Sequence, residues 1–503
     1  MLKKPSDLLN LDYQSRQLSI LLAACLALLA LPILVTGGRS LSWPILHDAP
    51  LMHYIAWRIQ SGAVPYRDLF DQNMPGIYLL HLLVYKLFQD SDLAWRLIDL
   101  CCAALTMIVM AWYCRPFGRW AMAFAPLLFF GYHLYLGPRQ VGQRDFFILP
   151  LVLLSALGIN RFLEQRRTTL PLILSGLVFG LALSIKPHLA LLGVIFGLML
   201  AAWTRKAPRV LIKSWLAFGL SALVIPLLMG WWLWRIGAWH SFVDIVSNYL
   251  LPFYSKLHQD SRGVIADRFV KSTCMFYVML PLLPLLVPGR QILEPRRLML
   301  LAGTFYGFIN YFLQNKGFIY HLYPLFLFLC PLSVMGLKQG FTDTRREVRI
   351  ATLIGLFMLS SLMGFFCWQS RSLLGSLQPQ RDRVQNLVRD LSALGKPGQT
   401  VQVMDTTSGG IEALLRLHLR QPTRFIYDFY FFYDTEDPRI KKLRAEFMRG
   451  FEHQPRPLLV VMEDSWVHSG YDRLNLFPEL VYLIDNTYTL ALEREGYRIY
   501  APR

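Results

Sequence analysis

Long uncharged apolar stretches fill the first three quarters of the chain, and the charged residues fall between them. Residues 17–36 form the first stretch, and comparable ones recur up to about Trp368. Only a lipid bilayer tolerates many apolar runs of about twenty residues. We therefore predict about eleven membrane-spanning helices, at 17–36, 95–114, 120–137, 146–162, 169–186, 188–204, 212–234, 269–288, 298–314, 318–336 and 349–368. The first stretch is too long for a signal-peptide core, so we expect it to be a retained anchor.

Beyond about Ser370 the pattern changes to short apolar runs separated by polar, helix-like segments. Strand-like runs are Val401–Met404, Arg424–Tyr427 and Leu458–Met462. Asp437 followed by Pro438 predicts a capped helix start, with apolar residues recurring at Ile440, Leu443, Phe447 and Phe451. Alternating strands and helices indicate a small α/β domain. The predicted fold is an α-helical multi-pass membrane domain (1–369) followed by a soluble α/β domain (370–503).

The distribution of charged residues predicts how the chain is oriented in the membrane. The net charge is +18, but the basic residues gather in alternate loops, as they do in the cytoplasmic loops of membrane proteins, and this argues against a nucleic-acid partner. An odd number of spans starting inside puts the C-terminal domain on the periplasmic or extracellular side of the inner (plasma) membrane.

The seven cysteines all lie in apolar segments. The C-terminal domain therefore has no disulfide framework and no cysteine metal site. We assign no metal ligand and no cofactor, and the sequence leaves open whether a divalent metal takes part.

The first outer loop, residues 37–94, holds the most informative polar residues. Asp48 precedes Ala49-Pro50 and a helical pattern that ends near Gly62. An aspartate in this position suits a helix N-cap. A carboxylate beside the membrane could equally act as a general base, because an attacking hydroxyl needs a proton acceptor.

Further along the same loop, two carboxylates and an arginine stand between aromatic residues, at Tyr66, Arg67, Asp68 and Asp71. They could form a substrate site, or a turn stabilised by side-chain bonds of the aspartates. The apolar segment Pro75–Phe88 that follows is too short for a span, and we expect an interfacial or partly inserted helix.

Other polar residues are predicted to reach the same membrane face. Arg144 and Asp145 precede the fourth span, where they suit a headgroup anchor and an N-cap or a second part of the site. Lys186 interrupts the apolar residues between the fifth and sixth spans, and could snorkel to the interface. Together with Arg144, the cations and donors Lys186, Lys316, Tyr320 and His321 could instead bind a phosphate leaving group.

These residues carry a resemblance. An aspartate after the first span, the Gly-x-x-Pro-Tyr-Arg-Asp-x-Phe-Asp stretch Gly62–Asp71 and a Pro-Gly helix start resemble the GT-C superfamily of membrane glycosyltransferases. The most similar branch contains the family 39 protein mannosyltransferases, the aminoarabinose transferases and the Rgt-type galacturonosyltransferases. Phe88–Arg96, Lys186-Pro187 and Lys316–Pro324 fit the same pattern.

The resemblance implies a reaction. A sugar would pass from a polyprenyl-phosphate donor to an envelope lipid, glycan or protein, with inversion, and Asp48 and Asp145 would match the family's catalytic acids. Some members bind the donor through a lysine before the first-loop proline, where this chain has Asn73-Met74. From the residues alone, a lipid or solute transporter and a noncatalytic envelope scaffold remain alternatives.

Overall fold

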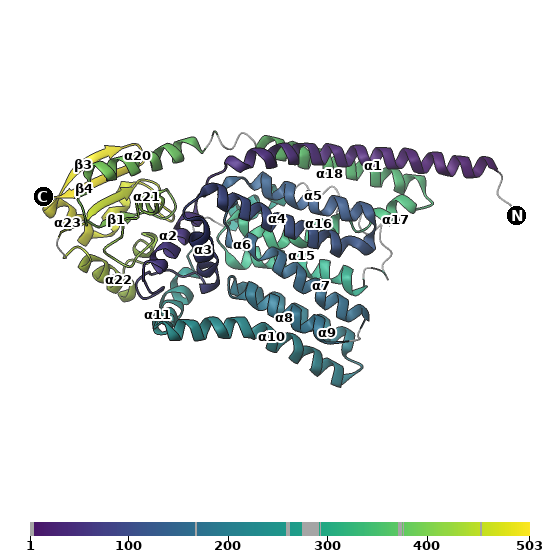
Figure 1. The fold of residues 1–503 in the computed structure, drawn as a ribbon, viewed down its shortest axis with the longest axis horizontal. Helices are drawn as coiled ribbons and strands as arrows, with labels where there is room; N and C mark the ends of the chain where they lie inside the picture. The colour runs from purple at the N-terminus through teal and green to yellow at the C-terminus, as the bar shows by residue number, and fades with distance from the viewer. Residues whose placement is uncertain are drawn as a thin grey trace.

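The computed structural model describes residues 5–165, 168–257, 262–273, 291, 293–370, 375, 377–452 and 455–503, with side chains from residue 16 onward. A bundle of helices forms one part, and a small mixed sheet with its own helices lies at the opposite end from the N-terminus (Figure 1). The loop between α9 and α10 also lies at the end of the bundle away from the sheet.

Seven stretches of the described residues are long and apolar enough to cross a membrane: Arg16–Ser42, Asp92–Phe117, Arg144–Gln165, Pro187–Thr204, Pro208–Arg235, Ile319–Thr342 and Arg346–Ser370. They contain the helices α1 (Pro5–Arg39), α4 (Asp92–Cys114), α7 (Leu149–Gln165), α9 (Ala190–Thr204), α10 (Pro208–Arg235), α16 (Tyr323–Val334) and α18 (Arg346–Ser370). The prediction of a multi-pass membrane protein is confirmed.

Three more predicted spans coincide with helices outside these seven, namely α5 (Arg119–Leu136), α8 (Leu170–Leu183) and α15 (Pro295–Gln314). The span predicted at 269–288 lies mostly outside the described residues, and only the end of α12 (Arg262–Thr273) falls within it. The number eleven therefore stays a prediction.

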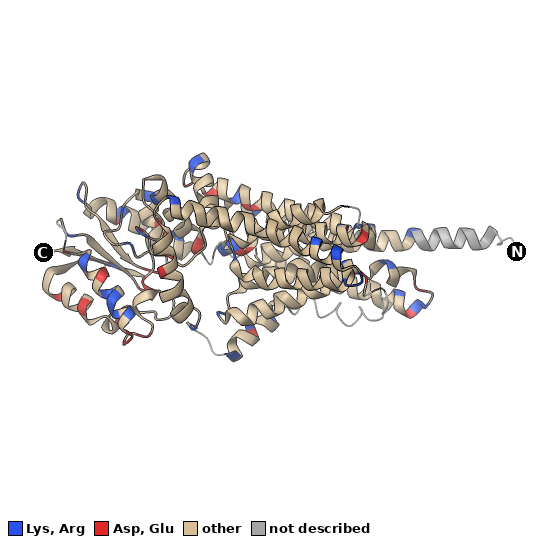
Figure 2. Cartoon of the chain, turned by 90° about the horizontal axis from the view of Figure 1, so that it is seen from below, with Lys and Arg blue, Asp and Glu red and all other residues tan. Residues whose placement is uncertain are grey.

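The bundle has two features of helices packed in a lipid bilayer: small residues where helices meet and an apolar outer surface. A Cβ at Gly307 of α15 would lie 2.3 Å from the Cα of Leu325 in α16, so glycine is what allows these two helices to approach. Large apolar side chains such as Leu31 and Leu227 are more than half exposed on the outside of the bundle. Charged residues concentrate towards the two ends of the molecule (Figure 2).

The first outer loop folds into two helices, α2 (Asp48–Gln60) and α3 (Pro75–Phe88), which lie between the bundle and the sheet (Figure 1). The helix predicted at Pro75–Phe88 is therefore present. The shorter elements of the helical part are η1 (Ser40–Ser42), η2 (Arg115–Phe117), η3 (Pro138–Gln140), α6 (Arg144–Phe147), η4 (Pro187–Leu189), α11 (Trp239–Ile245), η5 (Val246–Tyr254), η8 (Ile319–Leu322) and α17 (Leu337–Thr342).

The C-terminal region contains the predicted small sheet. Its strands β1 (Val401–Met404), β2 (Leu458–Met462), β3 (Tyr488–Arg494) and β4 (Tyr497–Pro502) have the order β1-β2-β4-β3, and only β1 and β2 pair in parallel, with Val401 opposite Leu458. The other elements are α20 (Gln378–Leu394), α21 (Gly410–Leu417), η9 (Phe429–Phe431), α22 (Pro438–Arg449), η10 (Tyr471–Leu476) and α23 (Pro478–Thr487).

Two sequence predictions in this region had different outcomes. Asp437 caps α22 by accepting a hydrogen bond from the backbone N–H of Arg439, as expected. The strand predicted at Arg424–Tyr427 is wrong, because Phe425 makes an isolated bridge with Phe70 of the first outer loop instead of joining the sheet. The apolar pattern of this run reflects packing between two distant segments.

Candidate active site

Asp48 is the first residue of α2. Its carboxylate lies 3.2 Å from Nδ1 of His47 and 3.8 Å from Nη2 of Arg144, and it accepts a 3.4 Å hydrogen bond from Nε2 of Gln143. The N-cap position belongs to His47, and no side-chain capping bond forms there. The expectation that Asp48 caps the helix is therefore wrong, and its carboxylate points to neighbouring polar side chains.

A glycine brings Arg144 close to Asp48. Gly142 has φ +78°, and a Cβ at this position would lie 2.7 Å from the Cβ of Ala49. Only glycine adopts this backbone without strain and leaves room for the start of α2. The Pro138–Asp145 turn can therefore pack directly against the helix that begins with Asp48.

Asp145 forms the second ion pair of the site. It is the second residue of α6, whose N-cap is Gln143 and has no side-chain capping bond, so the capping role expected for Asp145 is also wrong. Nζ of Lys186 lies 2.8 Å from Oδ2 of Asp145, and both side chains are less than a tenth exposed. Lys186 thus turns inward to a carboxylate rather than outward to the interface.

Backbone contact fixes the turn that carries Lys186. The N–H of Gly76, at the start of α3, donates a 3.0 Å hydrogen bond to the carbonyl of Ser184. A Cβ at Gly76 would lie 2.6 Å from that oxygen. The Pro-Gly sequence of the first outer loop therefore anchors α3 beside the Lys186 turn.

Two cavities meet at this cluster. The outer cavity, of about 280 Å³, lies between the membrane helices and the C-terminal region. It is lined by His47, Asp48, Gln72, Arg144, Tyr254, Phe318, Tyr320, Thr406, Thr407, Ser408, Tyr427, Phe429, Asp464, Ser465 and Trp466. The inner cavity, of about 390 Å³, is lined by residues that include Lys186, His188, Lys316 and His321. Gln72, Arg144 and Tyr254 line both cavities, and so form the wall between them.

The predicted cations are brought together around the inner cavity. Nζ of Lys316 donates a 2.6 Å hydrogen bond to the carbonyl of Tyr254 and a second one to that of Leu257, and burial lowers the pKa of Lys316 to about 8. Nη1 of Arg144 and Nδ1 of His321 are buried and have no hydrogen-bond partner within the part of the chain that the structure describes. They are therefore available to an anion in this cavity.

The second group of predicted site residues, Tyr66, Arg67, Asp68 and Asp71, borders neither cavity. Arg67 pairs with Asp68 at 2.8 Å, and Asp68 also accepts a hydrogen bond from the N–H of Val64. Asp71 is fully buried and accepts hydrogen bonds from Tyr78, Asn73 and the N–H of Gln72. These bonds are the ones expected of a turn stabilised by aspartate side chains, which was the alternative to a substrate site. They shape the loop that positions Gln72.

The electrostatics of the two first-loop carboxylates differ. Burial would raise the pKa of Asp48, but the charges of His47 and Arg144, with hydrogen bonds from His47 and Gln143, outweigh it and hold this pKa far below the ordinary range. Burial raises the pKa of Asp71 despite its hydrogen bonds. Asp48 is therefore the carboxylate that stays ionised beside an open cavity.

Several lining residues were absent from the sequence predictions. They are His47, Gln72, Gln143 and Tyr254, and the last three give little signal because their partners are distant in the chain. In the turn Thr406–Gly410, the backbone N–H groups of Ser408 and Gly410 are already bonded to the carboxylate of Asp405. No cluster of three or more His, Cys, Asp or Glu side chains suited to a metal occurs among the described residues.

Comparisons with known proteins identify a similar family and similar folds. Residues 72–234 match the family described as dolichyl-phosphate-mannose-protein mannosyltransferase. No curated protein matches the sequence. ArnT from Cupriavidus metallidurans, in a structure bound to undecaprenyl phosphate, superposes with a TM-score of 0.63 at 12% identity, over 94% of this chain and 97% of ArnT. Its apo structure gives a TM-score of 0.57 at 13% identity, over 97% of this chain and 98% of ArnT.

A more distant similarity is to the archaeal oligosaccharyltransferase AglB from Archaeoglobus fulgidus, solved with an inhibitory peptide and a dolichol-phosphate. Its TM-score is 0.52 at 12% identity, over 95% of this chain and 74% of AglB. The chain has the fold of the GT-C membrane glycosyltransferases, and the predicted resemblance is confirmed. The matched family is described as a mannosyltransferase, and the structures of ArnT and AglB were solved with a bound lipid phosphate.

Proposed function

We propose that this protein transfers a sugar from a polyprenyl-phosphate donor to an acceptor hydroxyl of the cell envelope, with Asp48 as the general base. The observation that carries the proposal is the wall between the two cavities, where Asp48 and Arg144 meet. An acceptor in the outer cavity would reach Asp48, while a donor phosphate in the inner cavity would reach Arg144.

The reaction is a direct displacement. The acceptor oxygen forms a bond to the anomeric carbon as the bond from that carbon to the phosphate oxygen breaks. The acceptor proton goes to Asp48, and polyprenyl phosphate leaves with the bonding electrons. Attack from the side opposite the phosphate inverts the anomeric configuration.

Cations around the inner cavity suit a departing phosphate. Arg144 and Lys186 would contact the phosphate, and His321 offers a buried ring nitrogen. Hydrogen bonds to charged groups contribute about 1.5–3 kcal/mol each. These residues would take the place of the first-loop lysine found in some relatives, because the corresponding position here is Asn73-Met74.

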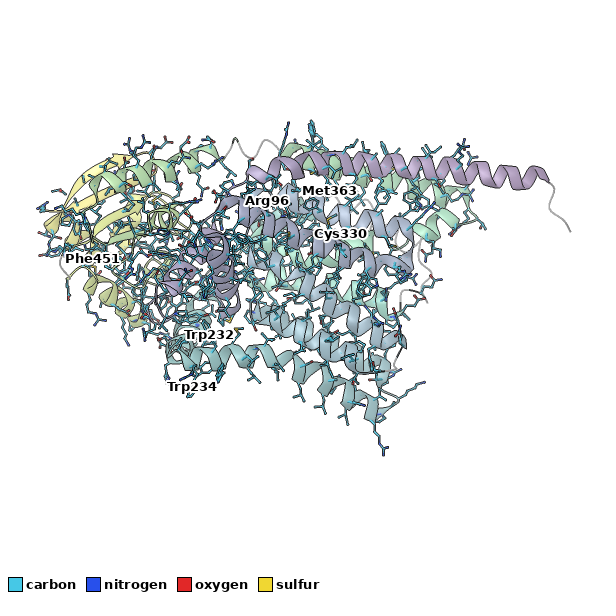
Figure 3. All side chains as sticks on the ribbon, in the orientation of Figure 1. Arg96, Trp232, Trp234, Cys330, Met363 and Phe451 are labelled. Atoms are coloured by element: carbon cyan, nitrogen blue, oxygen red, sulfur yellow. The ribbon has the colours of Figure 1, made fainter. Side chains whose placement is uncertain are left out.

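An apolar cavity continues from the inner one. It has a volume of about 650 Å³, shares Met74 and Pro187 with the inner cavity, and is lined mainly by side chains of α10. Trp234, near the end of α10 (Figure 3), contributes to its wall. A polyprenyl chain would find here the apolar surface that it needs next to the phosphate.

Arg144 would also couple donor binding to base strength. Arg144 helps to hold Asp48 ionised and therefore weakly basic. A phosphate that draws the guanidinium towards the inner cavity would weaken its interaction with Asp48 and raise the proton affinity of that carboxylate. Asp48 would then become an effective base only when a donor is bound.

The test uses purified protein in detergent with a panel of radiolabelled undecaprenyl-phosphate sugars and envelope membranes from source cells that lack the protein. We expect labelled envelope product and free undecaprenyl phosphate from at least one donor. Asp48→Asn should abolish both, whereas Asp68→Asn, at a carboxylate outside the cavities, should not. Equal turnover of the Asp48→Asn and wild-type proteins would contradict the proposal, and donor movement without bond cleavage would indicate a transporter.

The proposal also requires that the site face the periplasm or cell exterior. Reporter fusions at Lys206 and Lys396 should report opposite sides of the inner membrane, with Lys206 cytoplasmic. The same side for both positions would overturn the eleven-span topology and the assignment of the site to the outer face.

A further inference from the structure

Two loops of the C-terminal region face Asp48 across the outer cavity. Thr406–Ser408 follow β1, and Asp464–Trp466 follow β2 shortly after its end. Because β1 and β2 are parallel, their carboxyl ends meet at one edge of the sheet. The sheet therefore supplies one wall of the cavity and the membrane helices supply the other.

A buried ion pair holds these two loops in place. Arg473 and Asp428 are 3.1 Å apart and fully buried. Arg473 also donates hydrogen bonds to the carbonyls of Met404 and Met462, the last residues of β1 and β2. Asp428 accepts hydrogen bonds from the hydroxyls of Thr406 and Ser465.

The loops are also joined to each other. The hydroxyl of Ser408 donates a 2.8 Å hydrogen bond to the carbonyl of Asp464, and the hydroxyls of Thr406 and Ser465 lie 2.9 Å apart. Two strand ends, one ion pair and these bonds make the wall rigid before any ligand arrives. Such preorganisation is typical of a binding site.

One donor on this wall remains without a partner. Nε1 of Trp466 is buried and has no hydrogen-bond partner within the described ranges. The indole ring contacts Phe429 and Phe318, with ring centroids 5.1 and 5.6 Å apart, and borders the cavity. A buried indole N–H normally finds an acceptor, so this group indicates a ligand with an acceptor oxygen.

The residues that line the outer cavity indicate which class of ligand it would bind. Aromatic rings stand on both walls, among them Tyr254, Tyr320 and Trp466, and polar groups that suit hydroxyls lie between them. The lining holds Arg144, which lies 3.8 Å from Asp48, and Asp464, which pairs with Arg383. The lining therefore carries no excess positive charge for an anionic acceptor. Flat apolar faces combined with uncharged hydrogen-bonding groups fit a neutral sugar ring.

We infer that these two loops form the acceptor subsite, and that the acceptor hydroxyl that gives its proton to Asp48 belongs to a sugar. The inference rests on the proposed function. The sugar would lie between Trp466 and the aromatic residues of the membrane helices, with a ring oxygen or hydroxyl accepting from Nε1 of Trp466. Thr407, whose side chain borders the cavity, would bind a second hydroxyl.

The test is the labelling experiment of the proposed function, followed by linkage analysis of the envelope product. We expect the label on a sugar hydroxyl. A label on an amino-acid side chain or on a phosphate would overturn this inference while leaving the glycosyltransferase function intact. Absence of labelled product and of Asp48-dependent donor cleavage would instead overturn the proposed function itself.

Kinetics with the same acceptor fraction supply a second readout. Trp466→Ala should raise the apparent KM for acceptor by about tenfold or more, and Thr407→Val by about threefold to tenfold, which are the effects of one or two lost contacts. The KM for donor should stay constant. Trp466→Phe keeps the apolar face and loses only the donor, so its effect should be intermediate.

Two exposed positions of the same region serve as controls. Tyr482→Ala on α23 and Thr489→Val on β3 remove similar groups away from the cavity and should leave both constants unchanged. Thermal unfolding of each variant separates loss of folding from loss of binding. If well-folded Trp466→Ala and Thr407→Val proteins keep the wild-type KM for acceptor, these loops are not the acceptor subsite.

Discussion

The molecule contains two buried charge clusters that are alike in composition and different in surroundings. Asp48, Arg144 and Lys186 line the two cavities, and Asp145 pairs with Lys186 behind them. In the other cluster, Asp99 pairs with Arg96 and lies 2.9 Å from Nε2 of His133, and all three are fully buried. Figure 3 labels Arg96 in the helical part of the molecule. Access to a cavity, rather than charge alone, distinguishes a site from a support.

The cluster of Arg96, Asp99 and His133, which is sealed from both cavities, also has neutral partners. Arg96 donates to the hydroxyl of Ser40 and lies 4.6 Å from the ring of Trp43, and the hydroxyl of Tyr323 lies 2.7 Å from Nδ1 of His133. Phe146, next to Asp145 in the chain, stacks on His133 with centroids 4.0 Å apart. The sealed cluster therefore supports the short helix that carries Arg144 and Asp145.

Among the variants, the change at Asp48 should have the largest effect on the transfer rate. Asp48→Asn should lower the transfer rate by roughly a hundredfold to ten-thousandfold, the usual contribution of a positioned general base. Folding should remain close to wild type, because the carboxylate caps no helix and borders a cavity. Turnover and thermal unfolding are measured on the same preparation, with Asp68→Asn as control. Near-normal turnover would remove Asp48 from the mechanism.

The sealed cluster should respond in the opposite way. Asp99→Asn leaves the guanidinium of Arg96 buried without its anionic partner, which costs about 3–5 kcal/mol of stability. The protein that remains folded should bind donor with a normal KM. Denaturant unfolding in detergent measures the first effect and donor kinetics the second. A stable Asp99→Asn protein with a raised donor KM would place this cluster in the site and break the distinction.

Lys186 belongs to the open cluster and should show a mixed effect. Lys186→Met removes a phosphate contact worth about 1.5–3 kcal/mol and should raise the donor KM tenfold to a hundredfold. It also leaves Asp145 without its cation, so stability should fall. Lys316→Met should have a smaller effect on donor binding, because its ammonium is already bonded to two carbonyls.

A double variant separates the two consequences of losing Lys186. Lys186→Met combined with Asp145→Asn removes the stranded carboxylate, and it should regain stability but not donor affinity. Lys206→Met, at the far end of the bundle, is the control. Recovery of the donor KM in the double variant would mean that Lys186 serves only to balance Asp145.

The sequence predicts the fold more completely than the site, for a physical reason. Apolar periodicity and helix signals such as Asp437-Pro438 are local, so the apolar helices, β1 and β2 could be predicted. The ion pairs Asp48–Arg144 and Asp145–Lys186 join residues far apart in the chain, and their types could be predicted but not their pairing. The β3–β4 hairpin was not predicted.

The sequence did not predict that loops of the C-terminal region line the outer cavity. Thr406–Ser408 and Asp464–Trp466 are ordinary loop residues, and only the parallel pairing of β1 with β2 brings them together. The aromatic run at Phe425 was misassigned for a related reason, since its partner Phe70 lies in the first outer loop. Local pattern carries no information on such contacts.

A third charge cluster, between the first outer loop and the C-terminal region, should give the smallest effect. Arg416 lies 2.8 Å from Asp92 and 3.2 Å from Glu412, and it is partly exposed to water. Burial raises the pKa of Glu412 from 4.5 to about 7, even though Arg416 opposes the shift. The cluster therefore joins the two parts of the molecule with one carboxylate that resists ionisation.

The sign of the resulting pH dependence follows from proton binding. Between pH 4.5 and about 7 the folded state holds a proton on Glu412 that the unfolded state has lost. Stability should therefore fall as the pH rises through this window, by about 1–3 kcal/mol in total. Glu412→Gln mimics the protonated form and should flatten this part of the stability curve, whereas Glu479→Gln, at an exposed position, should leave it unchanged. Unfolding measured from pH 4.5 to 8 decides the matter, and an unaltered slope in Glu412→Gln would show that this carboxylate is ionised as easily in the folded protein as in the unfolded chain.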